Sequence, residues 1–448
     1  MKITILGAGL SGISSSYHLG HENCVVFEKN KYPGGHIHSY EKNGFTWDEG
    51  PHVSFTKHSY VRELFERSAN GDFRDFPVSV TNFFQGSWIP HPAQSNLWAI
   101  PQPLRQDCLD DFLKTRDLDS NNGPQNYQEW LERTFGAVFA NTFPRAYTRK
   151  YWTTDPENLT VDWVGNRVFY PEVDDVKRGF LAPLEEQTHY IKTIRYPERG
   201  GYFSFAKKMY EGADIRLSKT VSKISLSEKK IVFSDGTTHT YQKLINTLPL
   251  PLFVGMCEEA TPSIHEAAKS LSCSSLLLVN VGANHPTMRE DNWLYVYDED
   301  MYSTRINFTE LLSPNNAPNG KTGIQVEVYF SKYRQKKQSD SEIAARVCQE
   351  LVEMGLVKDR ESITSFHTKW VPWANVIFDD ARRKDQDAIF DFLTHYGLVR
   401  EEDDLEPMTN WETKQEVPLG ELNLAGRFGQ WKYFWTDDCV LRGKIFKA

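Results

Sequence analysis

The sequence predicts an α/β fold in which a parallel-sheet domain is interleaved with a mainly helical lobe and an antiparallel β-sheet lobe. An apolar strand, a glycine-rich turn, a helix and a second apolar strand open the chain over residues 3–27. The region from about 72 to 199 contains helical stretches and is rich in Trp, Tyr, Pro and Asn, and a β-rich region runs from 274 to 330. Residues 422–447 again indicate a strand, a Gly-rich turn and a helix, so both ends of the chain are expected in one domain.

Periodicity and turn residues predict the individual elements. The stretch from Tyr127 to Phe139 suits a helix, and the amphipathic stretch from Ser341 to Met354 suits another. Val221 to Leu226 and Lys230 to Phe233 are typical of strands, and Asp235-Gly236-Thr237 predicts a hairpin turn. These patterns divide the chain into five segments: a nucleotide-binding domain made of 1–70, 201–270 and 401–448, a mainly helical substrate lobe at 71–200, and a β-sheet substrate lobe at 271–400.

Composition excludes several classes of function. The 448 residues carry a formal net charge of -9 without a basic block, which argues against nucleic acid as the main partner. No apolar run approaches the roughly 20 residues that span a bilayer. Because Met1-Lys2 runs straight into the first strand, we expect no signal peptide. The six cysteines form no CxxC pair, so we expect reduced thiols, a cytoplasmic location and no metal site.

The opening turn has the pattern of a Rossmann-type dinucleotide site. Gly7, Gly9 and Gly12 form GxGxxG between a strand and a helix, where they permit a tight turn, close approach of a pyrophosphate and close packing of helix on strand. The pyrophosphate would lie at the positive end of the helix. Glu28 ends the next strand, in the range where an acid binds a ribose hydroxyl. These residues alone fit either NAD or FAD.

The following residues favour a flavin. Pro33-Gly34-Gly35-His36 adds a second glycine pair that lets backbone pack near the cofactor, and Phe45 to His52 comes next. Together these stretches resemble the flavin-binding start shared by amine oxidases, protoporphyrinogen oxidases and UDP-galactopyranose mutases. The resemblance implies FAD as the cofactor, with Gly34 and Gly35 among its contacts and Val221 as a further contact from the second segment of the domain.

The C-terminal segment predicts the other half of the flavin site. Gly426 would let backbone approach the flavin, and Arg427 would place a fixed positive charge near the pyrophosphate or the ring. The helix that begins near Asp437 would offer N–H donors to the pyrimidine end of a reduced flavin.

Among these families, the sequence most resembles the UDP-galactopyranose mutases, particularly the eukaryotic type. The matching blocks are Glu49 to Phe55, Trp88 to Asn96, Trp163 to Arg167, Trp293 to Tyr295 with Arg305, and Gly426 to Tyr433. The resemblance implies three catalytic residues, His52 beside the flavin and Arg167 and Arg305 on a diphosphate. It also implies a set of substrate contacts: Gln94, Trp163, Trp293, Tyr295 and Tyr433.

The chemistry that this resemblance implies is a ring contraction of a nucleotide sugar with no net redox change. N5 of the reduced flavin is the nucleophile at the anomeric carbon, and a reductant such as NAD(P)H activates the enzyme. A homo-oligomer is compatible with the family. The alternatives are a flavin oxidoreductase, an oxidase or desaturase of the amine oxidase or protoporphyrinogen oxidase type, and a flavoprotein that binds a sugar nucleotide without catalysis.

The chain departs from the mutase pattern at several positions. His91 and Ala93 stand where the family usually has aromatic residues, and alanine cannot stack on a base. Leu312 and Trp373 stand where the family has tyrosine near the phosphate, and leucine cannot donate a hydrogen bond. These departures leave the sugar and the nucleotide open.

Overall fold

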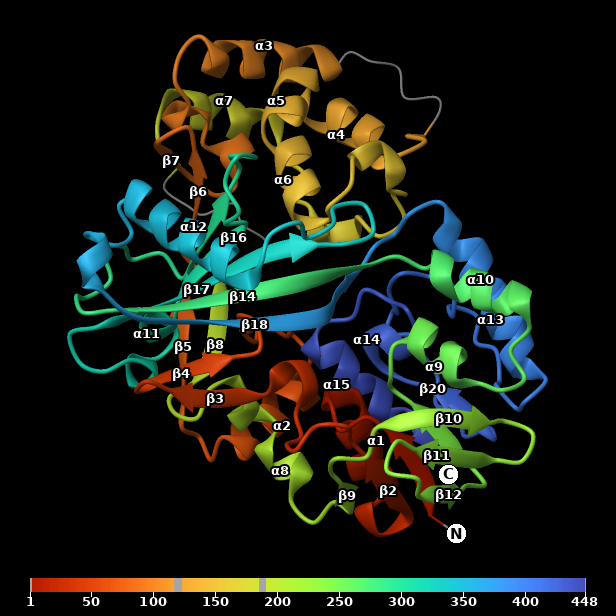
Figure 1. Cartoon of the computed structure of the whole chain (residues 1–448). Coiled ribbons are helices and arrows are strands. Elements are labelled where there is room, and N and C mark those ends of the chain that lie inside the picture. Colours follow the sequence, from red (N-terminus) through yellow and green to blue (C-terminus); the bar gives the residue numbers. More distant parts are fainter. Residues whose placement is uncertain (1, 117–122, 185–190, 448) are drawn as a thin grey trace.

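Five parallel strands form the sheet of the nucleotide-binding domain (Figure 1). The computed structural model describes residues 2–116, 123–184 and 191–447. In the order of the sheet, the strands are β20 (Leu422–Leu424), β13 (Leu244–Asn246), β1 (Ile3–Leu6), β2 (Cys24–Phe27) and β9 (Ile215–Arg216). Since every pair of neighbours is parallel, strands from the beginning, middle and end of the chain share one edge where their carboxyl ends meet.

Two helices from opposite ends of the chain pack against each other in this domain. These are α1 (Leu10–Leu19), red in Figure 1, and α15 (Thr436–Lys444), blue. The Ser14 hydroxyl donates to the carbonyl oxygen of Val440 at 2.7 Å. A Cβ at Gly443 would lie only 2.5 Å from the carbonyl carbon of Ser14 and from the amide nitrogen of Ser15. The helices therefore approach so closely that position 443 has no room for a side chain.

A seven-stranded sheet crosses the middle of the molecule. Its strands, in order, are β18 (Ile363–Val376), β14 (Cys273–Ala283), β17 (Thr322–Phe330), β16 (Arg305–Phe308), β15 (Trp293–Val296), β6 (Val80–Phe84) and β7 (Ser87–Pro90). All neighbours are antiparallel except β15 and β6, which are parallel. β6 and β7 come from the segment predicted as mainly helical, so this sheet draws strands from both substrate lobes.

The two faces of this sheet differ in character. Ile324, Val326 and Val328 of β17 pack in one apolar cluster with the buried face of α12 (Asp340–Glu353), which covers that side. Because successive strand residues point to opposite faces, Glu327 and Tyr329 face away from α12. The polar face of the sheet is thus turned toward the rest of the molecule.

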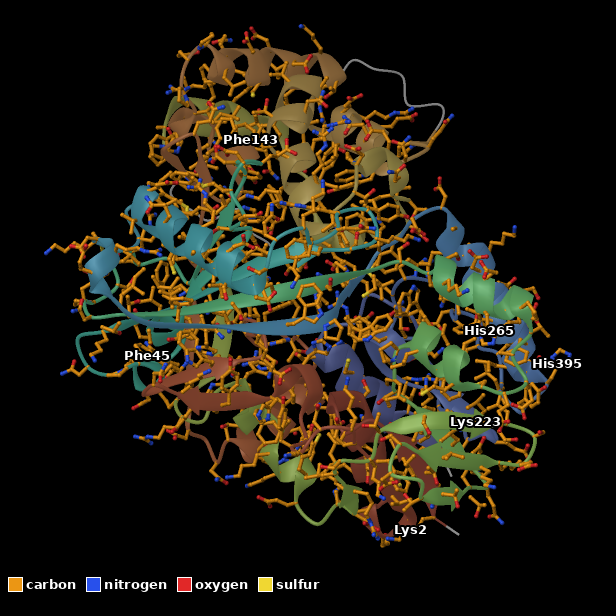
Figure 2. The ribbon with its side chains drawn as sticks, in the orientation of Figure 1. Lys2, Phe45, Phe143, Lys223, His265 and His395 are labelled. Atoms are coloured by element: carbon orange, nitrogen blue, oxygen red, sulfur yellow. The ribbon has the colours of Figure 1, made fainter. Side chains whose placement is uncertain are left out.

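The helical lobe lies at the top of Figure 1. It consists of α3 (Leu104–Thr115), α4 (Tyr127–Phe135), α5 (Ala137–Thr142), α6 (Pro144–Tyr151) and α7 (Val173–Leu181). The helix expected over 127–139 is interrupted at Gly136, which has φ 80°. A Cβ there would lie 2.8 Å from backbone atoms of Asp111 and Phe112, so glycine allows the chain to turn against α3. Phe143, labelled in Figure 2, is fully buried in this lobe.

The remaining elements connect these three parts. The small strands are β3 (Ser39–Lys42), β4 (Phe45–Asp48), β5 (Phe73–Pro77), β8 (Thr193–Pro197), β10 (Val221–Ser225), β11 (Lys230–Phe233), β12 (Thr238–Thr240), β19 (Val417–Pro418) and β21 (Phe446–Lys447). The other α-helices are α2 (Ser59–Ser68), α8 (Lys207–Tyr210), α9 (Leu250–Met256), α10 (Pro262–Ser270), α11 (Thr309–Leu312), α13 (Ala381–Thr394) and α14 (Gly426–Gly429). Across the three described ranges, no helix combines the length and apolarity needed to cross a membrane.

The contact between α1 and α15 predicts a strong effect of Gly443→Ala. The added methyl group would push the two helices apart, which should destabilise the protein by about 1–3 kcal/mol. Gly255→Ala is the matched control, because Gly255 also lies in a helix and a Cβ there meets nothing within 4 Å. Urea unfolding should show a lower midpoint for Gly443→Ala and an equal or higher one for Gly255→Ala. Equal midpoints for the two variants would contradict the packing described.

Candidate active site

Two glycine turns form the floor of the site. The turn at Gly9 lies against the turn at Gly34, where the Gly34 N–H donates to the Ala8 carbonyl oxygen at 2.9 Å. A Cβ at Gly35 would be 3.0 Å from the Gly9 Cα, and one at Gly12 would collide with the carbonyl oxygen of Gly7. Bare backbone therefore lies at the N-terminus of α1, as a pyrophosphate requires.

Glu28 is tied to the first turn. Its buried carboxylate accepts hydrogen bonds from the backbone N–H groups of Ala8 and Asn30, both at 2.9 Å. Its position at the end of β2, beside the glycine turn, is the one from which an acid binds ribose. Val221 lies in β10, opposite Phe233, whose ring packs on Phe27 of β2 at 4.7 Å.

The C-terminal segment closes over this floor. Gly426 has φ 84°, and a Cβ there would lie 2.8 Å from the Cβ of Ser11 in α1. Arg427 donates through Nη2 to Asn375 Oδ1 at 2.5 Å and through Nη1 to the carbonyl oxygen of Phe434 at 3.4 Å. Within the described chain its buried Nε finds no acceptor, so one donor is left for a bound group.

Two histidines, His36 and His52, feel the positive charge of Arg427. His52 Nδ1 donates to the Gly50 carbonyl oxygen at 2.8 Å, which leaves Nε2 as an acceptor. The pKa of His52 is lowered to about 4, mainly by burial and in smaller part by the positive charges of Arg305 and Arg427. Burial, then His52 and Arg427, lower the pKa of His36 to about 3. Both rings are neutral at pH 7, and the charge of the same arginine acts on both.

Together these groups fit a dinucleotide. Backbone glycines and a helix N-terminus suit its pyrophosphate, Glu28 suits a ribose, and the spare Arg427 donor suits an anionic oxygen or a ring acceptor. The described residues contain no group of His, Cys, Asp and Glu that could hold a metal ion. The six cysteines are free thiols.

The polar face of the seven-stranded sheet forms a wall beside this floor. Tyr295, Arg305 and Glu327 lie opposite one another on β15, β16 and β17. The Arg305 guanidinium holds the Glu327 carboxylate with two nitrogens, Nη2 lying 2.8 Å from Oε1. Glu327 is 2% exposed and Arg305 is 25% exposed. Arg305 is therefore already paired, and a diphosphate at this position would share it with a carboxylate.

Tyrosines of the helical lobe extend the wall. The Tyr147 ring lies 5.1 Å from that of Tyr295, and the Tyr151 ring lies 4.8 Å from that of Tyr329. The Tyr151 hydroxyl donates to Asn375 Oδ1 at 3.3 Å. Burial raises the pKa of Tyr147, Tyr151 and Tyr329 above the ordinary value, so all three hydroxyls stay protonated and can donate.

Sequence reasoning missed five residues of this wall: Tyr147, Tyr151, Glu327, Tyr329 and Asn375. Local signals existed for two pairs. Tyr147 and Tyr151 are four residues apart on one face of α6, and Glu327 and Tyr329 are polar positions that alternate with apolar ones in β17. No local pattern marks Asn375.

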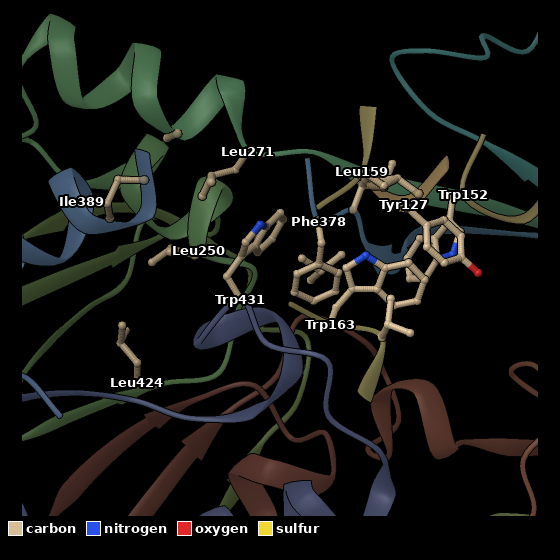
Figure 3. Close-up of a cluster of buried hydrophobic side chains, with 14 of the residues drawn as sticks. Tyr127, Trp152, Leu159, Trp163, Leu250, Leu271, Phe378, Ile389, Leu424 and Trp431 are labelled. Atoms are coloured by element: carbon tan, nitrogen blue, oxygen red, sulfur yellow. The ribbon is translucent and has the colours of Figure 1, made fainter. Parts of the chain in front are cut away.

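Arg167 and Trp163 lie with the C-terminal segment instead of on the sheet. Arg167 donates through Nη2 to the Tyr433 carbonyl oxygen at 2.6 Å, and its guanidinium lies 3.9 Å from the ring centres of both Tyr433 and Trp435. Trp163 is buried in the hydrophobic cluster of Figure 3, and its indole N–H donates to the Thr160 carbonyl oxygen at 2.7 Å. The Tyr433 ring also lies 5.1 Å from the Arg427 guanidinium, so this ring connects the two arginines.

The other expected substrate contacts are spread around the wall. Gln94 donates to the Phe169 carbonyl oxygen at 3.1 Å, and Trp293 pairs with Val80 and Asn307 across its strand. Of the positions that depart from the mutase pattern, Ala93 and Leu312 are buried in apolar clusters. The ring centre of Trp373 lies 6.2 Å from that of Trp431, and the ring centre of His91 lies 5.1 Å from that of Tyr295.

The lowered pKa of His52 predicts a pH dependence of stability. The unfolded chain binds a proton at the ordinary value of 6.5, and the folded chain binds it only near 4. Unfolding therefore takes up protons in this window, and stability falls as the pH drops from about 6.5 to 4. His52→Gln should reduce the slope by up to about 1.4 kcal/mol per pH unit, measured from urea midpoints at several pH values. His395→Gln, at an exposed site in Figure 2, is the control; an unchanged slope in His52→Gln would refute the prediction.

The chain is similar to known flavoproteins over most of its length. A family model described as flavin containing amine oxidoreductase matches residues 10–388. The crystal structure of reduced UDP-galactopyranose mutase matches with a TM-score of 0.86 at 23% identity, over 99% of this chain and 94% of that one. The 4,4'-diapophytoene desaturase of Staphylococcus aureus is 41% identical over 390 residues, which is 73% of this chain and 75% of the desaturase.

A third relative is protoporphyrinogen oxidase 2 of Arabidopsis thaliana, 22% identical over 192 residues and matched over 37% of its length.

The mutase comparison confirms the predicted fold, an α/β flavoprotein with interleaved substrate lobes. The family match confirms the predicted cofactor, FAD. The glycine turns, Glu28 and Arg427 thus lie in a chain that belongs to the flavin-containing amine oxidoreductase family.

Proposed function

We propose that this chain is an FAD-dependent nucleotide-sugar mutase that interconverts pyranose and furanose forms without net redox change. The observation that carries the proposal is the polar wall. Arg305 and Glu327 meet there with the hydroxyls of Tyr147, Tyr151 and Tyr329. Hydroxyl and guanidinium donors suit a polyhydroxylated, anionic substrate, which offers acceptors for their hydrogen bonds. A hydrocarbon substrate would displace water from these donors and offer them no hydrogen bonds in return, which costs free energy.

The side chains have separate tasks in this proposal. Reduced FAD supplies the nucleophile, its N5, for the anomeric carbon of the sugar. Arg305 and the tyrosine hydroxyls hold the diphosphate while it leaves and returns, since they donate to its oxygens as negative charge develops. Glu327 fixes the guanidinium plane. His52 offers Nε2 as an acceptor for a proton near the flavin.

Several features belong to the proposal as a whole. Arg167, stacked on Tyr433 and Trp435, holds the substrate from the C-terminal side together with Trp163, and Gln94, Trp293 and Tyr295 complete the pocket. His52, Arg167 and Arg305 are the proposed catalytic residues. The proposal includes a cytoplasmic enzyme, a reductant such as NAD(P)H and a homo-oligomer. UDP-galactose is the first substrate to test, and the departures at Ala93 and Leu312 favour trying other nucleotides and sugars beside it.

A flavin oxidoreductase is the second candidate. Two observations favour it: the desaturase is 41% identical to this chain, and the charge of Arg305 is neutralised by Glu327. An oxidase or desaturase needs no free cation over a diphosphate. The Tyr and Arg side chains on the wall argue against an apolar polyene as its substrate.

The two candidates predict different uses of electrons. Chemically reduced holoenzyme should change the pyranose-to-furanose ratio of UDP-galactose or another sugar nucleotide, followed by chromatography. Turnover should require the reductant but consume none in proportion to product. Stoichiometric reduction of the oxidised flavin by an amine, porphyrinogen or polyene, with no sugar isomerised, would refute the mutase.

Arg305→Ala tests the diphosphate contact. If Arg305 pairs with a buried phosphate, the variant should lose about 2–5 kcal/mol of binding free energy for the sugar nucleotide, measured by calorimetry. Arg346→Ala is the control, because Arg346 also pairs with carboxylates but lies on α12, on the opposite face of the same sheet. Equal affinities in Arg305→Ala and Arg346→Ala would remove Arg305 from the substrate site.

A further inference from the structure

Asn375 connects three parts of the molecule at one amide oxygen. Its Oδ1 accepts from Arg427 Nη2 at 2.5 Å and from the Tyr151 hydroxyl at 3.3 Å. Arg427 belongs to the C-terminal flavin segment, Tyr151 to the helical lobe, and Asn375 itself to the edge strand β18. The residue is 5% exposed, so these contacts are made away from water.

A backbone irregularity directs this side chain. In the pairing of β18 with β14, Asn375 lies opposite Ser274, but the next partners are Val371 and Leu276. Three residues of β14, 274–276, thus lie opposite five residues of β18, 371–375, which forms a bulge. The Asn375 N–H donates to the Ser274 hydroxyl at 3.1 Å, which fixes the end of the bulge. Bulges of this kind turn a side chain out of its regular direction, here toward Arg427.

The chemistry of the partner distinguishes the two arginines. Arg305 faces a carboxylate, which cancels its charge. Arg427 faces a neutral amide and a carbonyl oxygen, and takes part in no ion pair among the residues described. Its full positive charge is therefore held in a fixed place, with the buried Nε still free to donate. A guanidinium held by neutral acceptors keeps its full charge. It therefore stabilises a nearby anionic group more strongly than a guanidinium paired with a carboxylate does.

We propose that Asn375 is a positioning residue that fixes the charge of Arg427 beside the flavin and links this charge to the helical lobe through Tyr151. Arg427 then stabilises the reduced, anionic flavin relative to the oxidised form. A substrate that moves the Tyr151 hydroxyl changes the hydrogen bond from this hydroxyl to Asn375 Oδ1, the oxygen that also accepts from Arg427. The proposal requires bound FAD and does not depend on the mutase reaction.

The test is the midpoint potential of the holoenzyme flavin, measured by spectroscopic redox titration. Asn375→Ala should shift it to more negative values, because Arg427 loses its anchor, and should weaken FAD binding by about tenfold or more. The same substitution should have no further effect on the potential in an Arg427→Met background. Tyr151→Phe should give a smaller shift in the same direction.

Asn423→Ala is the matched control, since Asn423 of β20 is as buried as Asn375 but its amide contacts backbone groups alone. The midpoint potential of the flavin in Asn423→Ala should equal that of the unaltered protein. If Asn375→Ala does not fold, Asn375→Asp keeps the shape and cancels the Arg427 charge, so the potential should again become more negative. An unchanged potential in the folded Asn375 variant, or an equal shift of Asn375→Ala with and without Arg427, would overturn the proposal.

Discussion

The close contact of α1 with α15 is the constraint on which the cofactor site depends. The hydrogen bond from Ser14 to Val440 joins residues 426 positions apart. The N-terminus of α1 carries the first glycine turn, and Arg427 precedes α15, so this one contact places both halves of the site. Gly426 against Ser11 and Gly443 against Ser14 are positions where any side chain would separate them. The neighbouring parallel strands β1, β13 and β20 also join the N-terminal and C-terminal segments of the chain, because they pair within one sheet.

The sequence predicted the parts of this site that are local. Gly7 to Gly12, Glu28 and Gly34 lie within thirty residues of one another in a strand–turn–helix–strand order, and their geometry follows from that order. The C-terminal strand, turn and helix were predicted for the same reason. The helix at 127–139 was predicted too long, because a single glycine within an apolar period does not show that its backbone has a positive φ.

The wall could not be predicted in the same way, because it depends on long-range register. Arg305 meets Glu327 only because β16 pairs with β17 in one particular register, and a shift of one residue would turn Glu327 to the other face. Tyr147 and Tyr151 have the spacing of ordinary core residues on a helix. Asn375 reaches Arg427 through a bulge that no local pattern announces.

Arg305 is paired with a carboxylate and Arg427 with neutral oxygens, and in the proposed function the polar wall binds the substrate. The most direct measurement is a crystal structure of the FAD complex with a bound nucleotide sugar. We expect the diphosphate between Arg305 and the tyrosine hydroxyls, with the sugar toward the flavin and Arg427 beside the cofactor. A diphosphate bound away from this wall, or a wall that excludes sugar nucleotides and accepts an apolar ligand, would contradict the proposed function.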